Sequence, residues 1–353
     1  MMRIARMIWA CLALTLAACG SPPGGRGDHA GQVVTVYSTT DSAVFNPVIA
    51  DFRRLHPEIR LRYVELDAGP LFERFVREVD GGQGSADIVL SSAMDLQVKL
   101  VNDGYAQKHS SSAADALPPA AKWRGEIFGL TFEPVVMVVN PDLLSAEETP
   151  RTRLDLVRSL RDRPDFWKRR IGTYDITQSN VGYLLAAQDA RQSSEFGALI
   201  ESMGKVEART YANIGVLIDD VAAGRVALGY NVLGSYAKSR LTQGARLRIV
   251  YPEDYTLAVV RAAFVSRTAP NPQGAHAFLE YLMSIRGQRI LATRSDLAAA
   301  STRVPGQYGR LGVQGAAIGP LRPIPIGPGL MTYLDKQKRE RFLANWRTAM
   351  GRN

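Results

Sequence analysis

Cysteine is almost absent from this sequence, and the two that occur, Cys11 and Cys19, both lie near its N-terminus. The rest of the chain therefore has no disulfide, which suits a domain large enough to be stabilised by its hydrophobic core. Beyond the N-terminal stretch, no apolar run approaches the roughly 20 residues needed to span a bilayer. The patterns GxxxxGKS, HExxH, CxxC and GxSxG are also missing. Nucleotide hydrolysis, zinc proteolysis and esterase chemistry therefore lack their starting residues.

The N-terminus, MMRIARMIWACLALTLAACG, has the organisation of an export signal. Arg3 and Arg6 precede an apolar run over residues 7–16, and small residues then lead to Cys19. The tetrapeptide LAAC resembles the bacterial lipoprotein cleavage box, which implies a lipid on Cys19; an ordinary cleaved signal followed by a cysteine is the alternative. We expect a signal peptide over 1–18, a lipidated Gly- and Pro-rich tether over 19–32, and a periplasmic or cell-envelope location.

Positive charge is in excess but is not concentrated in one place. The formal net charge is +9, and removal of Arg3 and Arg6 with the signal lowers it to +7. Because the basic residues are spread along the chain, we expect solubility and attraction to anions but no binding of nucleic acid. About 320 residues follow the signal and the tether, enough for two domains. We expect a monomer without a cofactor.

Short apolar runs alternate with amphipathic segments from residue 33 onward. Strands are predicted over residues 33–37, 59–66 and 86–92, and each is followed by a predicted helix. This rhythm predicts an α/β fold with parallel-rich sheets flanked by helices. Farther along, Pro134 is predicted to separate two strands and residues 145–168 to be helical. Residues 304–329 are rich in Pro and Gly, and residues 330–350 are predicted to form a closing helix.

Small hydroxyl and amide side chains collect at four places where a predicted strand passes into a predicted helix. The four junctions contain Ser38, Thr39 and Thr40; Ser91 and Ser92; Thr173, Tyr174, Ser179 and Asn180; and Tyr230, Asn231, Gly234 and Ser235. In an open parallel sheet such turns meet at the carboxyl ends of the strands, where ligands bind. A helix N-terminus offers unpaired N–H groups and about half a positive charge, so it can hold an anion without Lys or Arg. Gly234 would let the backbone approach that anion closely.

Each junction also has a simpler interpretation. Ser, Thr, Asn and Asp are the preferred N-cap residues of helices in general. We therefore expect about half of these side chains only to cap their helices. Asp41 is expected to be a cap rather than a ligand contact, because its charge would repel an anion.

A resemblance extends over almost all of residues 33–350. The segments VVTVYSTTD, FRRLHP, ADIVLSS, LVNDGYAQ, VVMVVNPDLL, LGYNVLGSYA and AFVSRTAPNPQGAHAFLEYLMSIRGQRILA occur in this order. Together they resemble the extracellular solute-binding proteins of ABC importers, in the branch of the ferric-ion and hexose-phosphate receptors. The resemblance implies a type II binding-protein fold, with two α/β lobes, a ligand in the cleft between them, and closure by hinge rotation.

The resemblance also implies how the chain is divided between the lobes. We expect crossovers near residues 133–134 and 255–257. The first lobe would contain residues 33–134 and 257–353, and the second lobe residues 135–256. The closing helix, with Lys336, Lys338, Arg339 and Arg341 on its polar face, is expected to pack on the first lobe; contact with lipid headgroups or a permease is the alternative.

The residues expected to bind the ligand differ from those of the ferric members of the branch. Those members have two adjacent tyrosines after the strand, and phenolates suit Fe(III). Here Gly234 and Ser235 stand at that place and only Tyr236 remains. The histidines available to complete an iron site, His56, His109 and His276, are predicted in helices or turns far from the junctions. An oxyanion such as a sugar phosphate is therefore expected, with ferric iron as the alternative.

Other side chains could contact the remainder of the ligand. Glu133 could accept hydrogen bonds from sugar hydroxyls, or it could pair with a neighbouring basic residue. Tyr174 and Tyr211 are weaker candidates of the same kind. The partner that receives the ligand would be an ABC permease, although a sensor kinase is an open alternative.

An enzyme is the remaining alternative. Ser235 and Lys238 form an SxxK pattern, which occurs in penicillin-recognising acyl-transfer enzymes. Ser202 and Lys205 match the same pattern, and neither KTG nor SDN is present. A binding protein without catalytic activity is therefore the preferred prediction.

Overall fold

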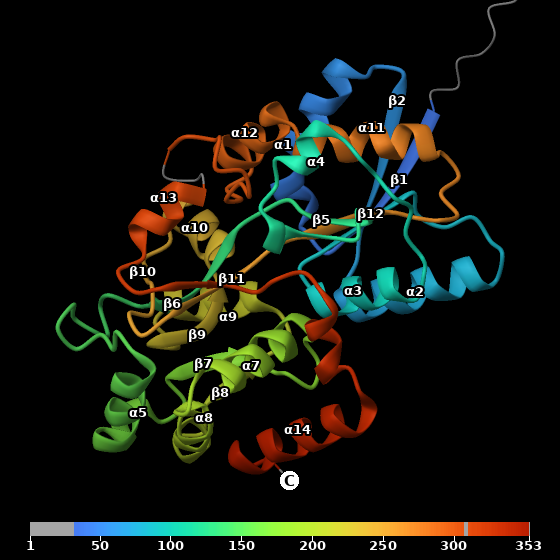
Figure 1. The fold of residues 1–353 in the computed structure, drawn as a ribbon. Helices are drawn as coiled ribbons and strands as arrows, with labels where there is room; N and C mark the ends of the chain where they lie inside the picture. The colour runs from blue at the N-terminus through green and yellow to red at the C-terminus, as the bar shows by residue number, and fades with distance from the viewer. Residues whose placement is uncertain (1–31, 307–309, 353) are drawn as a thin grey trace, which may run out of the picture. The chain divides into compact units, whose positions relative to one another are not determined.

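The computed structural model describes residues 32–306 and 310–352. All of them belong to one compact unit, Gly31–Asn353, built around two β-sheets flanked by helices (Figure 1). The predicted signal peptide, the lipidation site Cys19 and nearly all of the tether lie outside the described residues. Within the described part of the chain, no helix has the length and apolar character needed to cross a membrane.

The first sheet has six strands in the order β2-β1-β3-β12-β5-β4. Their bounds are β1 Gln32–Ser38, β2 Ile59–Glu65, β3 Ile88–Ser91, β4 Lys122–Trp123, β5 Ile127–Gly129 and β12 Ala262–Val265. β1 is parallel to β2 and β3, and β12 is antiparallel to β3 and β5. Alternate side chains of β1 enter different core clusters. Val34 and Val36 pack with α1 (Ser42–Leu55) and α11 (Pro272–Met283), whereas Tyr37 packs with α2 (Ala68–Asp80) and α3 (Met94–Asn102).

The second sheet has the order β13-β11-β6-β9-β7-β8, and β10 also pairs with β6. Its strands are β6 Glu133–Val139, β7 Ile171–Tyr174, β8 Arg209–Tyr211, β9 Leu228–Leu233, β10 Arg248–Val250, β11 Thr256–Val259 and β13 Leu321–Pro323. β7 is parallel to β8 and β9, whereas β6 is antiparallel to β9, β10 and β11. Both sheets are therefore mixed.

Fourteen α-helices occur in the described residues, several of them very short. Their bounds are α1 Ser42–Leu55, α2 Ala68–Asp80, α3 Met94–Asn102, α4 Ser112–Asp115, α5 Arg153–Asp162, α6 Pro164–Trp167, α7 Asn180–Gln192, α8 Phe196–Lys205, α9 Ile214–Ala222, α10 Gly234–Thr242, α11 Pro272–Met283, α12 Ile285–Arg294, α13 Arg310–Ala316 and α14 Lys336–Ala349. Two 3-10 helices, η1 Pro119–Ala121 and η2 Pro328–Tyr333, complete the set.

The chain changes sheet three times, the last time between β12 and β13, which belongs to the seven-stranded sheet. It passes from β5 to β6 after Gly129, and it returns from β11 to β12 after Val259. The first two passages are thus at residues 130–132 and 260–261. The predicted lobe boundaries, residues 33–134 with 257–353 and residues 135–256, stay a prediction.

Two local predictions are wrong, and two elements had not been predicted. Pro134 lies inside β6, opposite Ala258 of β11, rather than between two strands; a proline near the first residue of a strand is tolerated there. Residues 145–152 are not helical, because helix α5 begins only after Thr152, whose side chain forms a capping box with Asp155. The Pro- and Gly-rich stretch contains α13 and also β13, which adds an edge strand beside β11.

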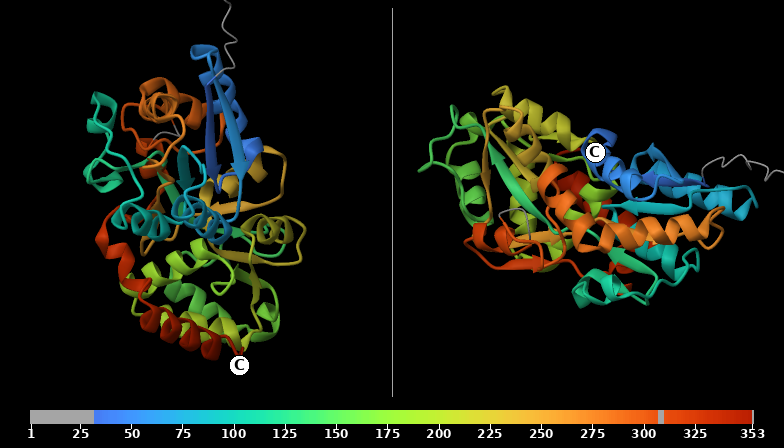
Figure 2. Two further views of the ribbon diagram at one scale, coloured as in Figure 1. Left: turned by 90° about the vertical axis from the view of Figure 1, so that its right-hand side faces the viewer. Right: turned by 90° about the horizontal axis from the view of Figure 1, so that it is seen from above.

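The closing helix also packs on a different partner from the one predicted. It begins at Lys336, capped by Asp335, and lies against α8, as both views show (Figures 1 and 2). The Phe342 ring contacts Tyr183 of α7 and Phe196 of α8. These two helices lie between β7 and β8 of the seven-stranded sheet in the chain. The expectation that this helix packs on the first lobe is therefore wrong. Its apolar side faces aromatic residues that are far away in the sequence.

Candidate functional site

A cavity of about 770 Å³ lies between elements of the two sheets. Predicted contacts from three of the four junctions line it, whereas the fourth junction reaches it only through neighbouring residues. Thr39 and Ser92 come from the six-stranded side, Tyr174, Ser179 and Asn180 from the turn between β7 and α7, and Leu233 and Tyr236 from the start of α10. We call this space the cleft cavity.

Several helices begin at the cleft cavity. Asp41, Asp67, Ser179, Asn213 and Leu233 are the N-cap residues of α1, α2, α7, α9 and α10, and all of them line the cavity. Ser92 lies two residues before the start of α3. The side chains of Ser179 and Asn213 accept hydrogen bonds from the backbone N–H groups of their own helices, so they act as caps. Six positive helix ends therefore converge on one space.

Carboxylates balance part of that positive potential. The cavity lining contains Asp41, Glu65, Asp67 and Asp219, with Arg240 as a basic partner. Glu65 accepts hydrogen bonds from the N–H and hydroxyl of Ser42 at 2.7 and 2.8 Å, and Asp219 lies 2.9 Å from Arg240.

Two carboxylates remain available to a ligand. Asp41 and Asp67 occupy N-cap positions, but their side chains make no capping hydrogen bond. Tyr236 donates to Asp41 at 3.3 Å. Asp41 is therefore at the predicted cap position without capping, and it faces the cavity. Sequence reasoning overlooked the acidic part of the lining, because acidic residues after strands are usually caps or solvated.

Several predicted contacts belong to the turns and do not line the cleft cavity. They are Ser38, Thr40, Ser91, Thr173 and Gly234. The Ser38 hydroxyl accepts a hydrogen bond from the Thr40 N–H, and the Ser91 hydroxyl accepts one from the Ala93 N–H. Thr173 donates to the Tyr230 carbonyl at 3.3 Å. These side chains stabilise the turns that carry the lining residues.

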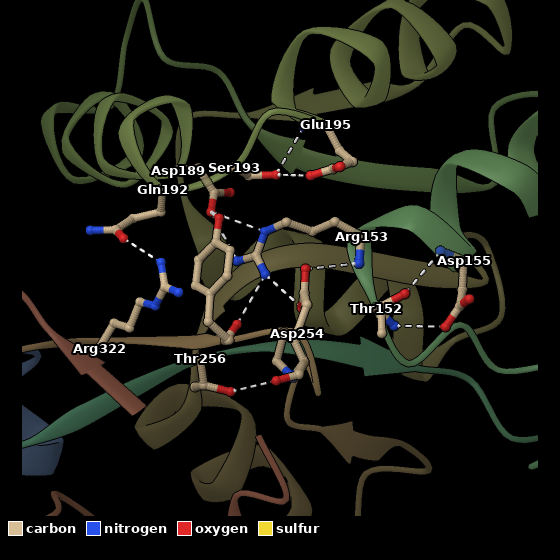
Figure 3. A network of polar contacts seen from close by, with 12 residues as sticks. Thr152, Arg153, Asp155, Asp189, Gln192, Ser193, Glu195, Asp254, Thr256 and Arg322 are labelled. Carbon is tan, nitrogen blue, oxygen red and sulfur yellow. Dashed lines mark hydrogen bonds and ion pairs between the residues drawn. The ribbon is translucent and has the colours of Figure 1, made fainter. Parts of the chain in front are cut away.

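Tyr230 and Asn231 belong to a buried polar network around Asp189, so the expectation that they face the ligand is wrong. The carboxylate of Asp189 accepts hydrogen bonds from the Tyr230 hydroxyl at 2.5 Å and from the Asn231 amide at 3.1 Å. Arg153 lies 2.8 Å from the same carboxylate and 2.9 Å from Asp254 (Figure 3). Burial, followed by the proximity of Asp189, raises the pKa of Tyr230 well above its usual value despite the nearby Arg153.

Glu133 is likewise fully buried, and it pairs with Arg261. The Nε atom of Arg261 lies 2.7 Å from Glu133, and the Thr131 hydroxyl donates to the same carboxylate at 2.8 Å. The hydroxyl of Ser235 donates to the other carboxylate oxygen, and Arg261 donates to the Thr40 hydroxyl at 2.8 Å. Pairing with a basic residue, one of the two interpretations left open by the sequence, is therefore what the structure shows.

Ser235 lines a smaller cavity that adjoins the cleft cavity, together with Asp41, Tyr236 and Arg261. Tyr236 and Asp41 line both spaces, so the Tyr236 ring stands between the cleft cavity and the buried guanidinium. The Arg261 guanidinium lies 5.4 Å from the centre of that ring. Burial raises the pKa of Tyr236, and Arg261 opposes this effect.

The histidines and Tyr211 lie away from the cleft cavity. His109 and His276 contact each other at 3.0 Å, His56 contacts Glu58, and Tyr211 donates to Asp220. Among the residues that the structure describes, no group of three or more His, Cys, Asp and Glu side chains is arranged to hold a metal ion. Tyr174 and Tyr236 are the phenols that line the cleft cavity.

The sequence pattern of a protein family described as bacterial extracellular solute-binding protein matches residues 34–294. A substrate-binding protein of an ABC transporter from Agrobacterium tumefaciens is 37% identical, with a TM-score of 0.86 over 92% of this chain and 96% of that one. The chain therefore belongs to the bacterial extracellular solute-binding proteins of ABC transporters. The predicted family and the predicted two-sheet α/β fold are both confirmed.

Two more distant similar proteins are associated with different solutes. Iron uptake protein A1 of Synechocystis sp. is 26% identical over 306 residues, which cover 78% of this chain and 79% of that protein. The structure of AfuA from Actinobacillus pleuropneumoniae, with fructose 6-phosphate bound, has a TM-score of 0.74 at 17% identity over 91% of this chain and 99% of that one. At this identity the AfuA likeness concerns the fold alone.

Proposed function

We propose that this protein captures a small phosphorylated polyol in the cleft cavity and delivers it to an ABC permease. The observation that carries the proposal is the cavity lining, in which helix N-termini from both sheet sides surround one space of about 770 Å³. The protein would act by binding alone, as a monomer without a cofactor. Lipid on Cys19 would hold it at the membrane.

The two kinds of group in the lining suit the two ends of such a ligand. Backbone N–H groups at the start of α7 and α9, with Ser179 and Asn180, would bind the phosphate. Asp41 and Asp67 would accept hydrogen bonds from the hydroxyl groups. A bare oxyanion fits less well, because these two carboxylates would repel it without receiving a hydrogen bond.

A calorimetric titration with fructose 6-phosphate, fructose and inorganic phosphate tests this proposal. Both parts of the ligand contribute in our account, so the phosphorylated sugar should bind more tightly than either fructose or phosphate. Equal affinity for fructose and its phosphate, or no affinity for any organophosphate, would contradict it.

A negative charge introduced at one helix N-terminus distinguishes an effect on ligand binding from an effect on folding. Asn180→Asp places a carboxylate in the first turn of α7, where it would repel phosphate but favour the helix. We expect loss of sugar phosphate binding without loss of thermal stability. Gln337→Glu makes the same change in the first turn of α14, outside the cavity lining, and should bind as the unmodified protein does.

Ferric iron is a second candidate, favoured by Tyr174, Tyr236 and Asp41 in the same lining and by the iron uptake relative. These are hard oxygen donors suited to Fe(III). Burial raises the pKa of both tyrosines, so iron would have to displace their protons. Ferric citrate would then produce a visible phenolate-to-iron absorption band that Tyr236→Phe weakens. Such a band, without any response to sugar phosphates, would replace the first proposal.

A further inference from the structure

A second cavity, of about 550 Å³, lies on the side of the seven-stranded sheet and shares no lining residue with the cleft cavity. It is bordered by the turn after α8, by β8 and by the residues after α14. Three arginines line it: Arg169, Arg209 and Arg352. We call this space the arginine cavity.

The carboxylates at the arginine cavity are already paired with cations outside its lining. Asp220 lies 2.6 Å from Arg225 but 3.7 Å from Arg209. Glu207 lies 3.0 Å from Lys168. Because Arg225 and Lys168 hold these two acids at shorter distances, Arg209 keeps only a long ion pair with Asp220, and Arg352 only a long one with Asp175, each at 3.7 Å.

The lining arginines also have unused hydrogen-bond donors. The Nε atom of Arg209 is buried, and it has no hydrogen-bond partner among the described residues. Arg352 lies 3.7 Å from Asp175, which is too long for a hydrogen bond. Arg169 makes no ion pair within residues 32–306 and 310–352. A buried donor without a partner is costly, so an acceptor in this cavity would be favourable.

We propose that the arginine cavity binds the phosphate group of a second ligand between Arg209 and Arg352. A planar guanidinium donates two parallel N–H groups to one oxyanion, which makes arginine well suited to phosphate. Both side chains remain partly exposed, at 36% and 43%, so an anion can reach them from solvent. The phosphate could be free or could belong to a lipid headgroup. This inference does not depend on the ligand of the cleft cavity.

Calorimetric titration with inorganic phosphate at constant ionic strength tests the arginine cavity. Arg209→Met and Arg352→Met should each weaken phosphate binding about tenfold or more, since each removes a charge-assisted contact. Arg158→Met is the matched control, because Arg158 is exposed on α5 and does not line the cavity. It removes the same charge and should leave the affinity unchanged.

The two cavities are distinguished by a further variant. Asn180→Asp alters the cleft cavity alone, so phosphate binding at the arginine cavity should persist in it. Phosphate binding that is lost in Asn180→Asp but kept in both arginine variants would overturn the proposal, as would the absence of any phosphate binding. Arg352 lies after the last helix, where a substitution disturbs the fold little. Arg352→Met therefore tests the site even if the Arg209→Met variant fails to fold.

Vesicles of phosphatidylcholine with and without phosphatidic acid identify the source of the phosphate group. Co-sedimentation that requires phosphatidic acid and is lost in Arg352→Met would support a lipid headgroup. Phosphate binding without co-sedimentation would support a free anion. Co-sedimentation that Arg352→Met leaves intact would count against the arginine cavity as the lipid site.

Discussion

Arg261 and Glu133 lie at or beside the first two passages of the chain between the sheets, and both side chains are almost completely buried. Removing one member of a buried ion pair leaves an uncompensated charge, which typically costs about 3–5 kcal/mol. We expect Arg261→Met to lower the free energy of unfolding, measured by urea titration, by this amount.

A double-mutant cycle provides the control for this prediction. Replacing both members with uncharged residues is often nearly neutral, because no buried charge remains. Arg261→Met combined with Glu133→Gln should therefore be more stable than Arg261→Met alone. A double variant whose loss equals the sum of the single losses would show that the two charges are not coupled.

Asp95, in the first turn of α3, is a buried carboxyl group with an oxygen that has no hydrogen-bond partner among the described residues. Burial raises its pKa from 3.8 to about 6, against the opposing effect of backbone N–H groups and Arg339. The folded chain therefore holds this proton to higher pH than the unfolded chain does. Its contribution to the free energy of unfolding falls as pH rises between these two values and is constant above them.

Asp95→Asn should remove this pH dependence. We expect the variant to be more stable than the unmodified protein at about pH 7, and this advantage should shrink as the pH falls toward about 4. Each unit of pKa shift corresponds to about 1.4 kcal/mol. Thermal unfolding of both proteins across this range measures the difference, and a difference that does not change with pH would contradict the assignment.

Some features of the site could be predicted from the sequence at the scale of single residues, and others could not. The junctions were recognisable because a strand followed by Ser, Thr or Asn is a local pattern, and predicted contacts of three of them line one cavity. The sequence did not reveal that Tyr230 and Asn231 are hydrogen-bonded to Asp189, because Asp189 is 41 and 42 residues away from them in sequence. Which residues of a junction point into the cleft depends on such distant partners. The individual ligand contacts therefore stay predictions.

At the scale of elements, α14 packs closely on α8 at Gly204. A Cβ atom at Gly204 would overlap the carbonyl oxygen of Ala349 and come within 2.9 Å of the Cα atom of Met350. Overlap with backbone cannot be relieved by a change of side-chain rotamer, so Gly204→Ala should destabilise the protein by about 1–3 kcal/mol or more. Denaturant unfolding measures this loss.

Gly197 is the matched control for Gly204, because it lies in the same helix and a Cβ atom there would meet nothing within 4 Å. Gly197→Ala should stabilise the helix by about 0.5–1 kcal/mol. Equal effects at the two glycines would mean that α14 does not pack on α8 as described.

Elements whose identity follows from a local period were largely predictable. The strands of β1 and β2 and the helices α1, α2 and α11 lie close to where their apolar patterns place them. β13 was missed, because a short strand that contains Pro323 is stable only as an edge partner of β11. The partner of α14 was missed because an apolar helix face does not specify which surface covers it.

At the scale of the whole binding unit, the two sides of the cleft cavity come close together at its rim. Tyr236 contacts Asp41 across the cavity, and Gly69 at the start of α2 faces Asn180 at the start of α7. A Cβ atom at Gly69 would lie 3.2 Å from the Asn180 side-chain oxygen. The absence of a side chain at Gly69 therefore allows the two helix ends to approach each other.

Side chains of increasing size at Gly69 should hold the two sides apart. The small Gly69→Ala change can be accommodated by a slight movement of Asn180, whereas Gly69→Leu requires the helix ends to separate. We expect a larger radius of gyration by small-angle X-ray scattering and weaker sugar phosphate binding for Gly69→Leu, and little change for Gly69→Ala. The free energy of unfolding should not fall in either variant, because alanine and leucine favour a helix over glycine. A Gly69→Leu variant that scatters and binds as the unmodified protein does would show that closure at this rim is not required for ligand capture.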